Sequence, residues 1–280
     1  MNISKGLECG ITHDGNGAII TKYNGKEKTL IVPEEVEVSG KKYPVTAIAE
    51  NAFADNENIE DAIIPAVCKD IGAGAFKGCK KLKRVKILHG ITVIRSEAFA
   101  GCSDLEDIDM PSSVERIESK AFDGCLALQE VRLSPALKCI REKAFQGCVS
   151  LKEITIPMDV VEIGASAFAG CKSLKKVRLP EVIGNIGAFA FYECENLESC
   201  ELPYDLICIT EGLFKDCKSL SFVKIQEGTK LISSWAFAGC TSLADIKIPS
   251  TVRLIHDDAF QGANVSGLKL PNHLRMPKEL

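Results

Sequence analysis

Apolar and polar positions along this chain repeat with a fixed period of 23 residues. The most regular position of the repeat is a phenylalanine, found at Phe53, Phe76, Phe99, Phe122, Phe145, Phe168, Phe191, Phe214, Phe237 and Phe260. No insertion or deletion interrupts the ten copies, and an isoleucine stands five residues before each of them. A fixed period of about 20 to 50 residues is typical of units that bury their apolar side chains only by stacking on their neighbours. The pattern therefore predicts a solenoid of similar coils.

Each repeat contains two short strand patterns, which residues 170–191 show most clearly. Residues 176–179 read Lys-Val-Arg-Leu, and this alternation indicates a strand that is buried on one face. A second short strand is expected at Ile183 and Ile186, and a single helical turn is expected beside Phe191. We therefore expect an α/β-type repeat solenoid that is dominated by strands, with one long parallel β-sheet on one face and little helix.

The first part of the chain lacks the period and shows hairpin signals instead. The Asn-Gly pair at 24–25 separates the apolar runs 18–23 and 29–32. Asn-Gly between such runs is the strongest short signal for a β-hairpin. A second hairpin is expected around the Ser-Gly pair at 39–40. We therefore predict that residues 1–44 form an N-terminal β-hairpin cap.

Residues 45–280 are expected to form the solenoid itself, with about ten 23-residue repeats and a short C-terminal edge. After Phe260 the pattern loses one residue, and Val265, Leu268 and Leu270 take the apolar places. No substantial cap follows this edge in the sequence. We therefore expect a partner or a second copy of the chain, as in a homodimer, to cover it.

Charge and composition narrow the classes of function. The net charge is −4 at pH 7, with 34 Lys and Arg against 38 Asp and Glu. Nucleic-acid binding needs a surplus of basic side chains on one face, so we expect no nucleic-acid partner. No stretch has the length and apolarity of a membrane span, and the first residues lack the apolar run of a signal peptide. As written, the chain is expected to be cytoplasmic.

The thirteen cysteines are expected to be unpaired. Eight of them follow a lattice phenylalanine by three residues, from Cys79 to Cys240, and so form a column. Stacked strands are about 4.8 Å apart, slightly farther than the Cβ separation of a disulfide. A zinc site needs close cysteine pairs that converge from different segments, and the sequence has none. We therefore expect buried, reduced thiols, no metal and no cofactor.

Catalytic motifs are also missing from the sequence. His13, His89, His256 and His273 fall at unrelated positions of the repeat, so no pair of them is placed for a triad or a metal site. Neither a Walker-type phosphate loop nor a GxGxxG motif occurs. We expect a protein that is not an enzyme.

The repeat Ala-Phe-x-Gly-Cys-x-x-Leu-x-x-Ile-x-Ile-Pro-x-x-Val-x-x-Ile resembles the BspA-type leucine-rich repeat family over residues 45–271. The resemblance implies a right-handed leucine-rich-repeat coil without catalytic residues. It also implies adhesion, because the studied members are mostly surface or secreted proteins that adhere to host proteins or to other cells. A secreted or cell-surface location is therefore the alternative to the cytoplasm.

The strand side chains that point away from the core form the first candidate binding surface. They stand eight and ten residues after each phenylalanine, and neighbouring repeats often alternate in charge, as at Arg178, Glu201 and Lys224. One interpretation is cross-strand charge pairing. The other is a polar recognition strip with Phe222 as its aromatic anchor. The candidate residues on this surface are Lys176, Arg178, Phe222 and Lys224.

A group of aromatic residues forms the second candidate. Phe189 and Trp235, the only tryptophan, occupy the same repeat position, two residues before a lattice phenylalanine. Tyr192 and Tyr204 are near Phe189 in sequence, and Gly212 leaves space between the two larger side chains. The group is either an exposed aromatic binding patch or local packing of long side chains over the turns.

Together these features predict a non-catalytic, adhesion-type scaffold that binds a protein, or a glycan, through its exposed sheet face or its aromatic patch. The alternative is a structural spacer or self-assembly module that associates through its open C-terminal end.

Overall fold

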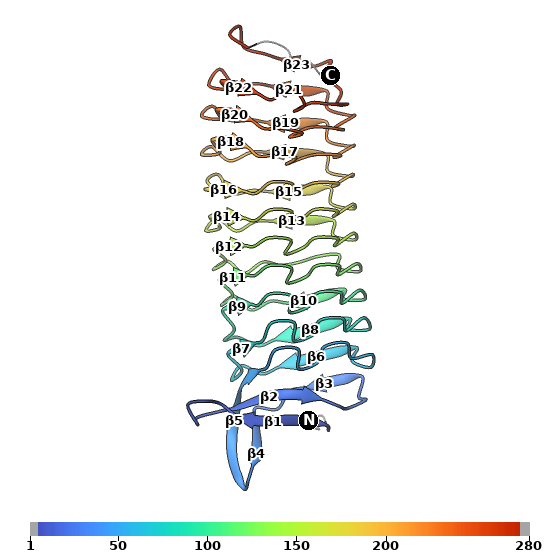
Figure 1. Cartoon of the computed structure of the whole chain (residues 1–280), viewed down its shortest axis with the longest axis vertical. Coiled ribbons are helices and arrows are strands. Elements are labelled where there is room, and N and C mark those ends of the chain that lie inside the picture. The colour runs from blue at the N-terminus through green and yellow to red at the C-terminus, as the bar shows by residue number, and fades with distance from the viewer. Residues whose placement is uncertain (1–4, 275–280) are drawn as a thin grey trace.

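The protein is a flattened rod of stacked coils, and the chain climbs from one end of the rod to the other (Figure 1). The structure is a computed structural model that describes residues 5–274. Across these residues, each coil consists of short strands and turns, and no helix is present. The strand-dominated solenoid that the 23-residue period predicts is therefore confirmed.

One face of the rod is a parallel sheet with one short strand per coil, called the main sheet below. Its first part pairs β3 (Thr29–Ile31), β6 (Asp61–Ile64), β8 (Arg84–Ile87) and β10 (Asp107–Asp109). Its second part pairs β13 (Glu153–Thr155), β15 (Lys176–Arg178), β17 (Ser199–Glu201), β19 (Phe222–Lys224), β21 (Asp245–Lys247) and β23 (Leu268–Lys269). Equivalent residues of successive coils pair in register, as Ile154 and Val177 do. Successive side chains of a strand point to opposite faces, so these residues are buried and their neighbours are exposed.

The main sheet is interrupted once, which corrects the prediction of one long sheet. No strand forms at residues 130–132, between β10 and β13. This coil also carries a serine, Ser134, at the place where the coils on either side have Pro111 and Pro157. The Ser134 hydroxyl is buried and donates to the carbonyl oxygen of Ser112 at 2.9 Å. The face is therefore two sheets of four and six strands.

A second side of the rod carries two-residue strands that end at the isoleucine five residues before each lattice phenylalanine. They are β7 (Asp70–Ile71), β9 (Val93–Ile94), β11 (Arg116–Ile117), β12 (Cys139–Ile140), β14 (Glu162–Ile163), β16 (Asn185–Ile186), β18 (Cys208–Ile209), β20 (Leu231–Ile232) and β22 (Leu254–Ile255). Strands β9 to β16 form one parallel sheet, and β18 to β22 form another. The second short strand predicted in each repeat is therefore confirmed.

The third side of each coil holds the lattice phenylalanine in a run of turns, where the sequence predicts a single helical turn. A left-handed backbone before and after the phenylalanine explains the difference. In one coil, Lys143 (φ 57°) and Gly147 (φ 69°) flank Phe145. Residues with such φ values cannot continue a right-handed helix. The Phe145 amide instead donates to the carbonyl oxygen of Ala167 in the next coil at 2.8 Å, so backbone hydrogen bonds join the coils on this side too.

Two glycine-to-alanine substitutions distinguish the cost of an unfavourable backbone conformation from the cost of a steric clash. Gly124 has φ +71°, but an added Cβ would come no nearer than 3.9 Å to another atom, whereas at Gly164 it would lie 2.4 Å from the Glu142 nitrogen. We expect Gly124→Ala to cost about 1 kcal/mol of stability. Gly164→Ala is expected to cost about 3 kcal/mol, because the neighbouring backbone must move. Urea unfolding followed by circular dichroism measures both, and equal costs would contradict the close approach at Gly164.

The N-terminal end contains two antiparallel hairpins. Strand β1 (Leu7–Ile11) pairs with β2 (Ala18–Tyr23), and β4 (Glu35–Val38) pairs with β5 (Lys41–Ile48). The hairpin predicted around residues 39–40 is therefore confirmed. Strand β5 then continues into the rod, where its end pairs with β7. That residues 1–44 act as a cap stays a prediction.

The hairpin predicted around the Asn-Gly pair at 24–25 is wrong. Strand β2 pairs in parallel with β5, and β3 pairs in parallel with β6 on the main sheet. The two apolar runs do form strands, as the sequence indicates. They do not pair with each other, because β3 belongs to the main sheet and β2 pairs with β5 instead. Tertiary pairing therefore outweighs the local turn signal at this place.

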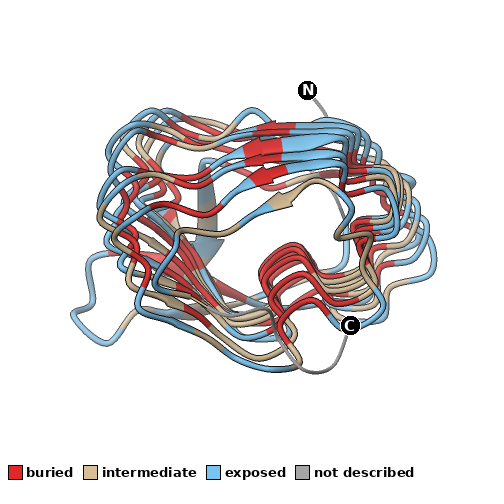
Figure 2. Ribbon diagram, turned by 90° about the horizontal axis from the view of Figure 1, so that it is seen from above, coloured by how far each residue is buried: buried red, intermediate tan, exposed pale blue. Residues whose placement is uncertain are grey.

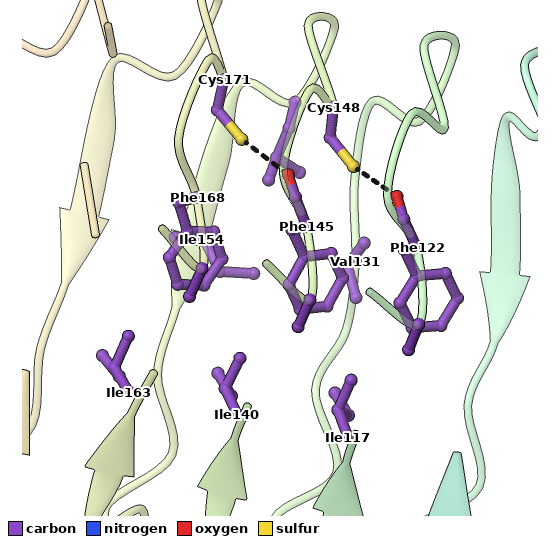
Figure 3. Close-up of a cluster of buried hydrophobic side chains, with 14 of the residues drawn as sticks. Ile117, Phe122, Val131, Ile140, Phe145, Cys148, Ile154, Ile163, Phe168 and Cys171 are labelled. Atoms are coloured by element: carbon purple, nitrogen blue, oxygen red, sulfur yellow. Dashed lines mark hydrogen bonds between the residues drawn. The ribbon is translucent and has the colours of Figure 1, made fainter. Parts of the chain in front are cut away.

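The lattice phenylalanines form one continuous stack inside the rod, and Figure 3 shows the part that contains Phe122, Phe145 and Phe168. All ten are at most 1% exposed. Successive ring centroids lie between 4.7 Å and 5.8 Å apart, and the ring planes are near parallel. The isoleucines at the ends of the second-side strands form an adjacent buried column, to which Ile117, Ile140 and Ile163 belong. Identical side chains therefore meet along the core, as the period predicts.

The eight lattice thiols form a further buried column. Each thiol donates to the carbonyl oxygen of a phenylalanine in the preceding coil, for example Cys148 to Phe122 and Cys171 to Phe145, both at 3.3 Å (Figure 3). All thirteen cysteines are free. Burial raises the pKa of Cys171 to about 12, so this thiol stays protonated at neutral pH.

The last described coil is one residue short, as the sequence predicts. Leu268 of β23 pairs with Ile246 of β21, so the interval is 22 residues instead of 23. Val265, Leu268, Leu270 and Leu274 are partly buried against the core. Coverage of this edge by a partner or a second copy stays a prediction, and residues 275–280 lie outside the described part of the chain.

Candidate binding surface

The outward side chains of the two parts of the main sheet form an exposed strip, which we call the strand row. It contains two residues per strand, such as Lys176 and Arg178 on β15, Ser199 and Glu201 on β17, Phe222 and Lys224 on β19, and Asp245 and Lys247 on β21. Both residues are exposed on every strand from β8 to β21. Figure 2 shows these exposed positions on either side of the buried residue in the strands of the main sheet. Hydrogen-bonded strands hold the strip in a fixed geometry.

The four candidates on the strand row lie close together. Strand β17 separates β15 from β19, and Ser199 pairs with Lys176 on one side and with Phe222 on the other. Since neighbouring strands are about 4.8 Å apart, Lys176 and Phe222 are separated by about 10 Å. Arg178 and Lys224 occupy the second exposed position of the same two strands. The Phe222 side chain is 38% exposed, so an aromatic group is available among the charges.

Charge pairing accounts for part of the strand row. The Lys224 Nζ lies 3.0 Å from the Glu201 carboxylate, and this hydrogen bond raises the pKa of Lys224. At the other end of the sheet, Arg84 lies 2.7 Å from Asp61. Exposed pairs of this kind contribute about 0 to 1 kcal/mol each. Charge pairing therefore accounts for these two contacts, and recognition by the strand row stays a prediction.

Three lysines of consecutive strands lie side by side at the C-terminal end of the strand row. Lys224 is in register with Lys247, and Lys247 is in register with Lys269. Like charges directly opposite each other destabilise a sheet, so charge pairing does not explain this end of the row. Phe222 and the three lysines line a hollow of about 400 Å³. The sequence pattern does not identify Lys269 as part of this group, because the last repeat is one residue short and Lys269 follows Lys247 by 22 residues instead of 23.

A larger hollow, of about 780 Å³, lies where the main sheet is interrupted. Val131 and Leu133 line one part of it, and Pro157 and Met158 line another. The Met158 side chain is 84% exposed. No candidate from the sequence lies at this hollow, because the period alone does not show where a strand fails to form.

The aromatic candidates divide into two places. The Phe189 ring lies over Gly212, where an added Cβ would come within 2.2 Å of it. The same ring meets Tyr192 edge-on at 6.0 Å. The Lys215 ammonium links this pair to Trp235, lying 4.8 Å from the Trp235 ring centroid and 5.9 Å from that of Tyr192. These three aromatic residues are half-buried, which favours local packing over the turns.

Tyr204 does not join the other aromatic residues. Among residues 5–274, its ring is not paired with another aromatic ring. It follows β17 on the main-sheet side of the coil, where its phenol is near enough to Lys224 to contribute to the raised pKa of that lysine, after Glu201. The side chain is 56% exposed. Tyr192 and Tyr204 are only 12 residues apart in sequence, but the coil turns between them, so they lie on different sides of the rod.

Two of the histidines make hydrogen bonds, and the acidic, histidine and cysteine side chains of the described residues do not gather into a metal site. Residues 5–274 contain no group of three or more His, Cys, Asp or Glu side chains that could hold a metal ion. His256 shares a hydrogen bond with the Ser234 hydroxyl at 3.1 Å, and His273 contacts the Val252 carbonyl oxygen at 2.7 Å. No described helix could cross a membrane.

A short coil with a parallel strand on one face, repeated without interruption around columns of Leu, Ile and Phe, defines a leucine-rich-repeat solenoid. The family model for the BspA type Leucine rich repeat region, in six copies, matches residues 46–175 and 138–266. The chain therefore belongs to the BspA-type leucine-rich repeat family.

Solved structures of bacterial leucine-rich-repeat proteins share the fold. A protein from Bacteroides ovatus is 23% identical, with a TM-score of 0.54, and the match covers 98% of this chain and 90% of that one. A leucine rich cell surface protein from Faecalibacterium prausnitzii is 25% identical (TM-score 0.53; 96% and 87%). A leucine-rich-repeat protein from T. pallidum is 28% identical (TM-score 0.50; 87% and 91%). No curated protein matches the chain.

Proposed function

We propose that the chain is a non-catalytic binding scaffold that recognises a protein through the strand row. The observation that carries the proposal is the set of exposed charges around Phe222 on the rigid main sheet. Lys176, Arg178 and Lys224 supply hydrogen-bond donors around the aromatic ring. Lys247 lies opposite Lys224, and this pair of like charges does not stabilise the sheet. An aromatic anchor within a polar rim is the usual arrangement of an interface hot spot.

Family membership supports a binding role. The Faecalibacterium prausnitzii protein is described as a leucine rich cell surface protein, and a surface location would suit adhesion. The free cysteines favour a reducing, cytoplasmic compartment instead. Because the strand row is built from the main sheet alone, the proposed recognition does not depend on the compartment. A glycan is the alternative ligand of the same surface.

The proposal is tested with a double variant, Arg178→Glu with Phe222→Ala, compared with wild type in affinity capture from candidate host and bacterial extracts. We expect the variant to lose a specific set of captured proteins while its melting temperature stays within a few degrees, because both side chains are exposed. Leu126→Ser is the control, since Leu126 is 46% exposed outside the strand row. Identical captured sets for wild type and the double variant would contradict the proposal.

Self-assembly is the second candidate function. Among the described residues, β22 and β23 each have a strand neighbour on one side only, so their other edges can pair with another chain. In the same experiment, sedimentation velocity separates the two functions. Concentration-dependent oligomers together with an unchanged captured set would favour the spacer role over recognition.

A further inference from the structure

Five of the most exposed large apolar side chains lie at one corner of three consecutive coils. They are Met158 (84% exposed), Val161 (60%), Val182 (61%), Tyr204 (56%) and Ile207 (66%). All five stand within four positions of each other in the repeat, between the main sheet and the second-side strands. A contiguous exposed apolar patch on a protein surface usually marks an interaction site.

The apolar corner is confined to these three coils. At the repeat position of Val161 and Ile207, the coils before and after carry Lys138 and Lys230, and the next coil carries Arg253. Burial in the core cannot explain Val161 and Ile207, because both side chains point to solvent. Apolar residues therefore replace basic ones at this exposed position in these coils only, and not in the neighbouring coils.

Within the three segments that carry the apolar corner, the charged residues all have one sign. Residues 158–165, 181–188 and 204–211, which we call the acidic apolar face, contain five carboxylates and no lysine or arginine. The carboxylates are Asp159, Glu162, Glu181, Asp205 and Glu211. The equivalent segments of the two adjoining coils, residues 135–142 and 227–234, both contain basic residues. The acidic character is thus specific to the same three coils as the apolar corner.

Only two of the five carboxylates are neutralised. Asp159 lies 2.6 Å from Lys138, and Glu162 lies 2.6 Å from Arg141, both across the boundary with the preceding coil. Among residues 5–274, Glu181, Asp205 and Glu211 take part in no ion pair. Negative charge therefore remains around Val182 and Ile207.

Small residues keep the acidic apolar face open to a partner. Gly164, Ala165, Gly187 and Ala188 occupy positions between the apolar corner and the turns that hold the phenylalanine, and Gly184 stands at the repeat position of Val161 and Ile207. Beside them, the second-side sheet is broken between β16 and β18, and the Thr210 hydroxyl donates to the Ile186 carbonyl oxygen at 3.0 Å. The Ile207 side chain is 66% exposed and is therefore accessible to a partner.

We propose that the acidic apolar face docks a protein segment that presents apolar side chains among lysines and arginines. Apolar contact would bury Val161, Val182 and Ile207, and the basic side chains would pair with Glu181, Asp205 and Glu211. The proposal does not rest on the strand row, which carries basic residues at Lys176 and Arg178. The two surfaces adjoin, since Met158 and Asp159 line the same hollow as Glu153 and Thr155 of that row, but Val161, Val182 and Ile207 lie outside it. The rod would then hold two partners of opposite charge.

The unpaired carboxylates favour a basic protein segment over a second copy of the chain, a membrane or a nucleic acid. Two copies of the chain in a symmetric contact would bring the unpaired carboxylates of one copy against those of the other. Membrane headgroups and nucleic acids carry phosphates, which the same carboxylates repel. A basic, apolar protein segment satisfies both features of the face.

A pair of synthetic peptides tests the proposal with the full chain. One is an amphipathic leucine–lysine peptide of about 18 residues, five helical turns; the other has glutamate in place of every lysine. Fluorescence anisotropy is expected to show binding of the lysine peptide only. The double variant Val161→Ser with Ile207→Ser is expected to weaken this binding at least about tenfold, because two apolar contacts are lost. Glu181→Lys is expected to weaken it as well.

Matched controls make the result specific. Leu254→Ser removes a side chain that is 53% exposed on the same side of a later coil, next to Arg253, and is expected to leave binding unchanged. Phe222→Ala on the strand row is expected to leave it unchanged too, so failure of the proposed function and failure of this inference are distinguishable. Circular dichroism confirms that each variant keeps the fold.

Met158 provides a readout at the face itself. Its thioether is 84% exposed, so peroxide should oxidise it readily in the free protein, and mass spectrometry measures the rate. Bound lysine peptide is expected to slow this oxidation. Binding without protection of Met158, equal binding of the glutamate peptide, or equal loss in the Leu254→Ser control would overturn the proposal. So would a dimer, seen by sedimentation, that the Val161→Ser and Ile207→Ser substitutions dissociate.

Discussion

Replacement of Phe145 by alanine is expected to lower the free energy of unfolding by about 3 to 5 kcal/mol, the usual cost of truncating a buried phenylalanine. Phe145 is fully buried, and its ring lies 5.1 Å from that of Phe122 and 5.4 Å from that of Phe168. The truncation therefore removes contacts with both neighbouring coils. In a solenoid, stability is close to a sum of coil and nearest-neighbour terms, so a loss at the middle weakens two interfaces at once.

Urea unfolding measures this loss, with circular dichroism for the whole rod and Trp235 fluorescence for its C-terminal half. Leu126→Ala is the matched control, because Leu126 is 46% exposed in the interval between Phe122 and Phe145 and should change stability by less than about 0.5 kcal/mol. Phe260→Ala is expected to cost less than Phe145→Ala, since among the described residues its ring stacks on Phe237 alone. A cost at Phe145 no larger than that at Leu126 would refute the ring stack as the main source of stability.

Alkaline solution is expected to unfold the protein through its thiol column. Burial raises the pKa of Cys79, Cys171 and Cys240 from about 9 to about 12. Because the folded pKa is the higher one, the stabilisation is complete below pH 9 and is lost as the pH rises from 9 towards 12. At pH 10 each such thiol costs about 1.4 kcal/mol. Eight of them together cost on the order of 10 kcal/mol, as much as the entire stability of a typical domain.

A pH titration followed at once by circular dichroism and by the ultraviolet absorbance of the thiolate checks this result. The two signals should change together above pH 9, because a thiol of the column ionises only when its coil opens. Cys9→Ser, at a half-buried position outside the column, should shift the alkaline midpoint less than Cys148→Ala, because burial raises the pKa of Cys9 too but Cys148 is fully buried. Cys148→Ala should make the free energy less dependent on pH. Thiolate absorbance that develops near pH 9 with an intact dichroism spectrum would disprove the coupling.

Much of the architecture follows from the sequence because one physical rule governs it. Identical intervals between Phe145, Phe168 and the other phenylalanines force like residues to meet, and alternation along residues 176–178 fixes which side chains face inward. The unpaired thiols follow from the same regular stacking, since equivalent cysteines of successive coils are about one strand spacing apart, slightly beyond the Cβ separation of a disulfide. Each of these features is determined within one repeat and recurs in every coil because the sequence pattern recurs.

Apart from the helical turn predicted beside each phenylalanine, the features that sequence analysis misses are those in which one coil differs from the next. The lost strand at residues 130–132 and the pairing of β2 with β5 depend on contacts between segments that no local signal describes. Tyr204 lies apart from Phe189 because the coil turns between them. The acidic apolar face was visible in principle, as an absence of lysine and arginine in three successive intervals, but only once the structure shows that those positions face solvent.

The uninterrupted phenylalanine interval has a consequence for how such a gene can change length. Recombination between two equivalent codons removes or adds one whole interval, and the coils on either side of the junction then present the same surfaces as before. The rod would grow or shrink in steps of about 5 Å, one strand spacing at a time. A family built this way can adjust its reach by unequal crossing-over, without first inventing a new hydrophobic core.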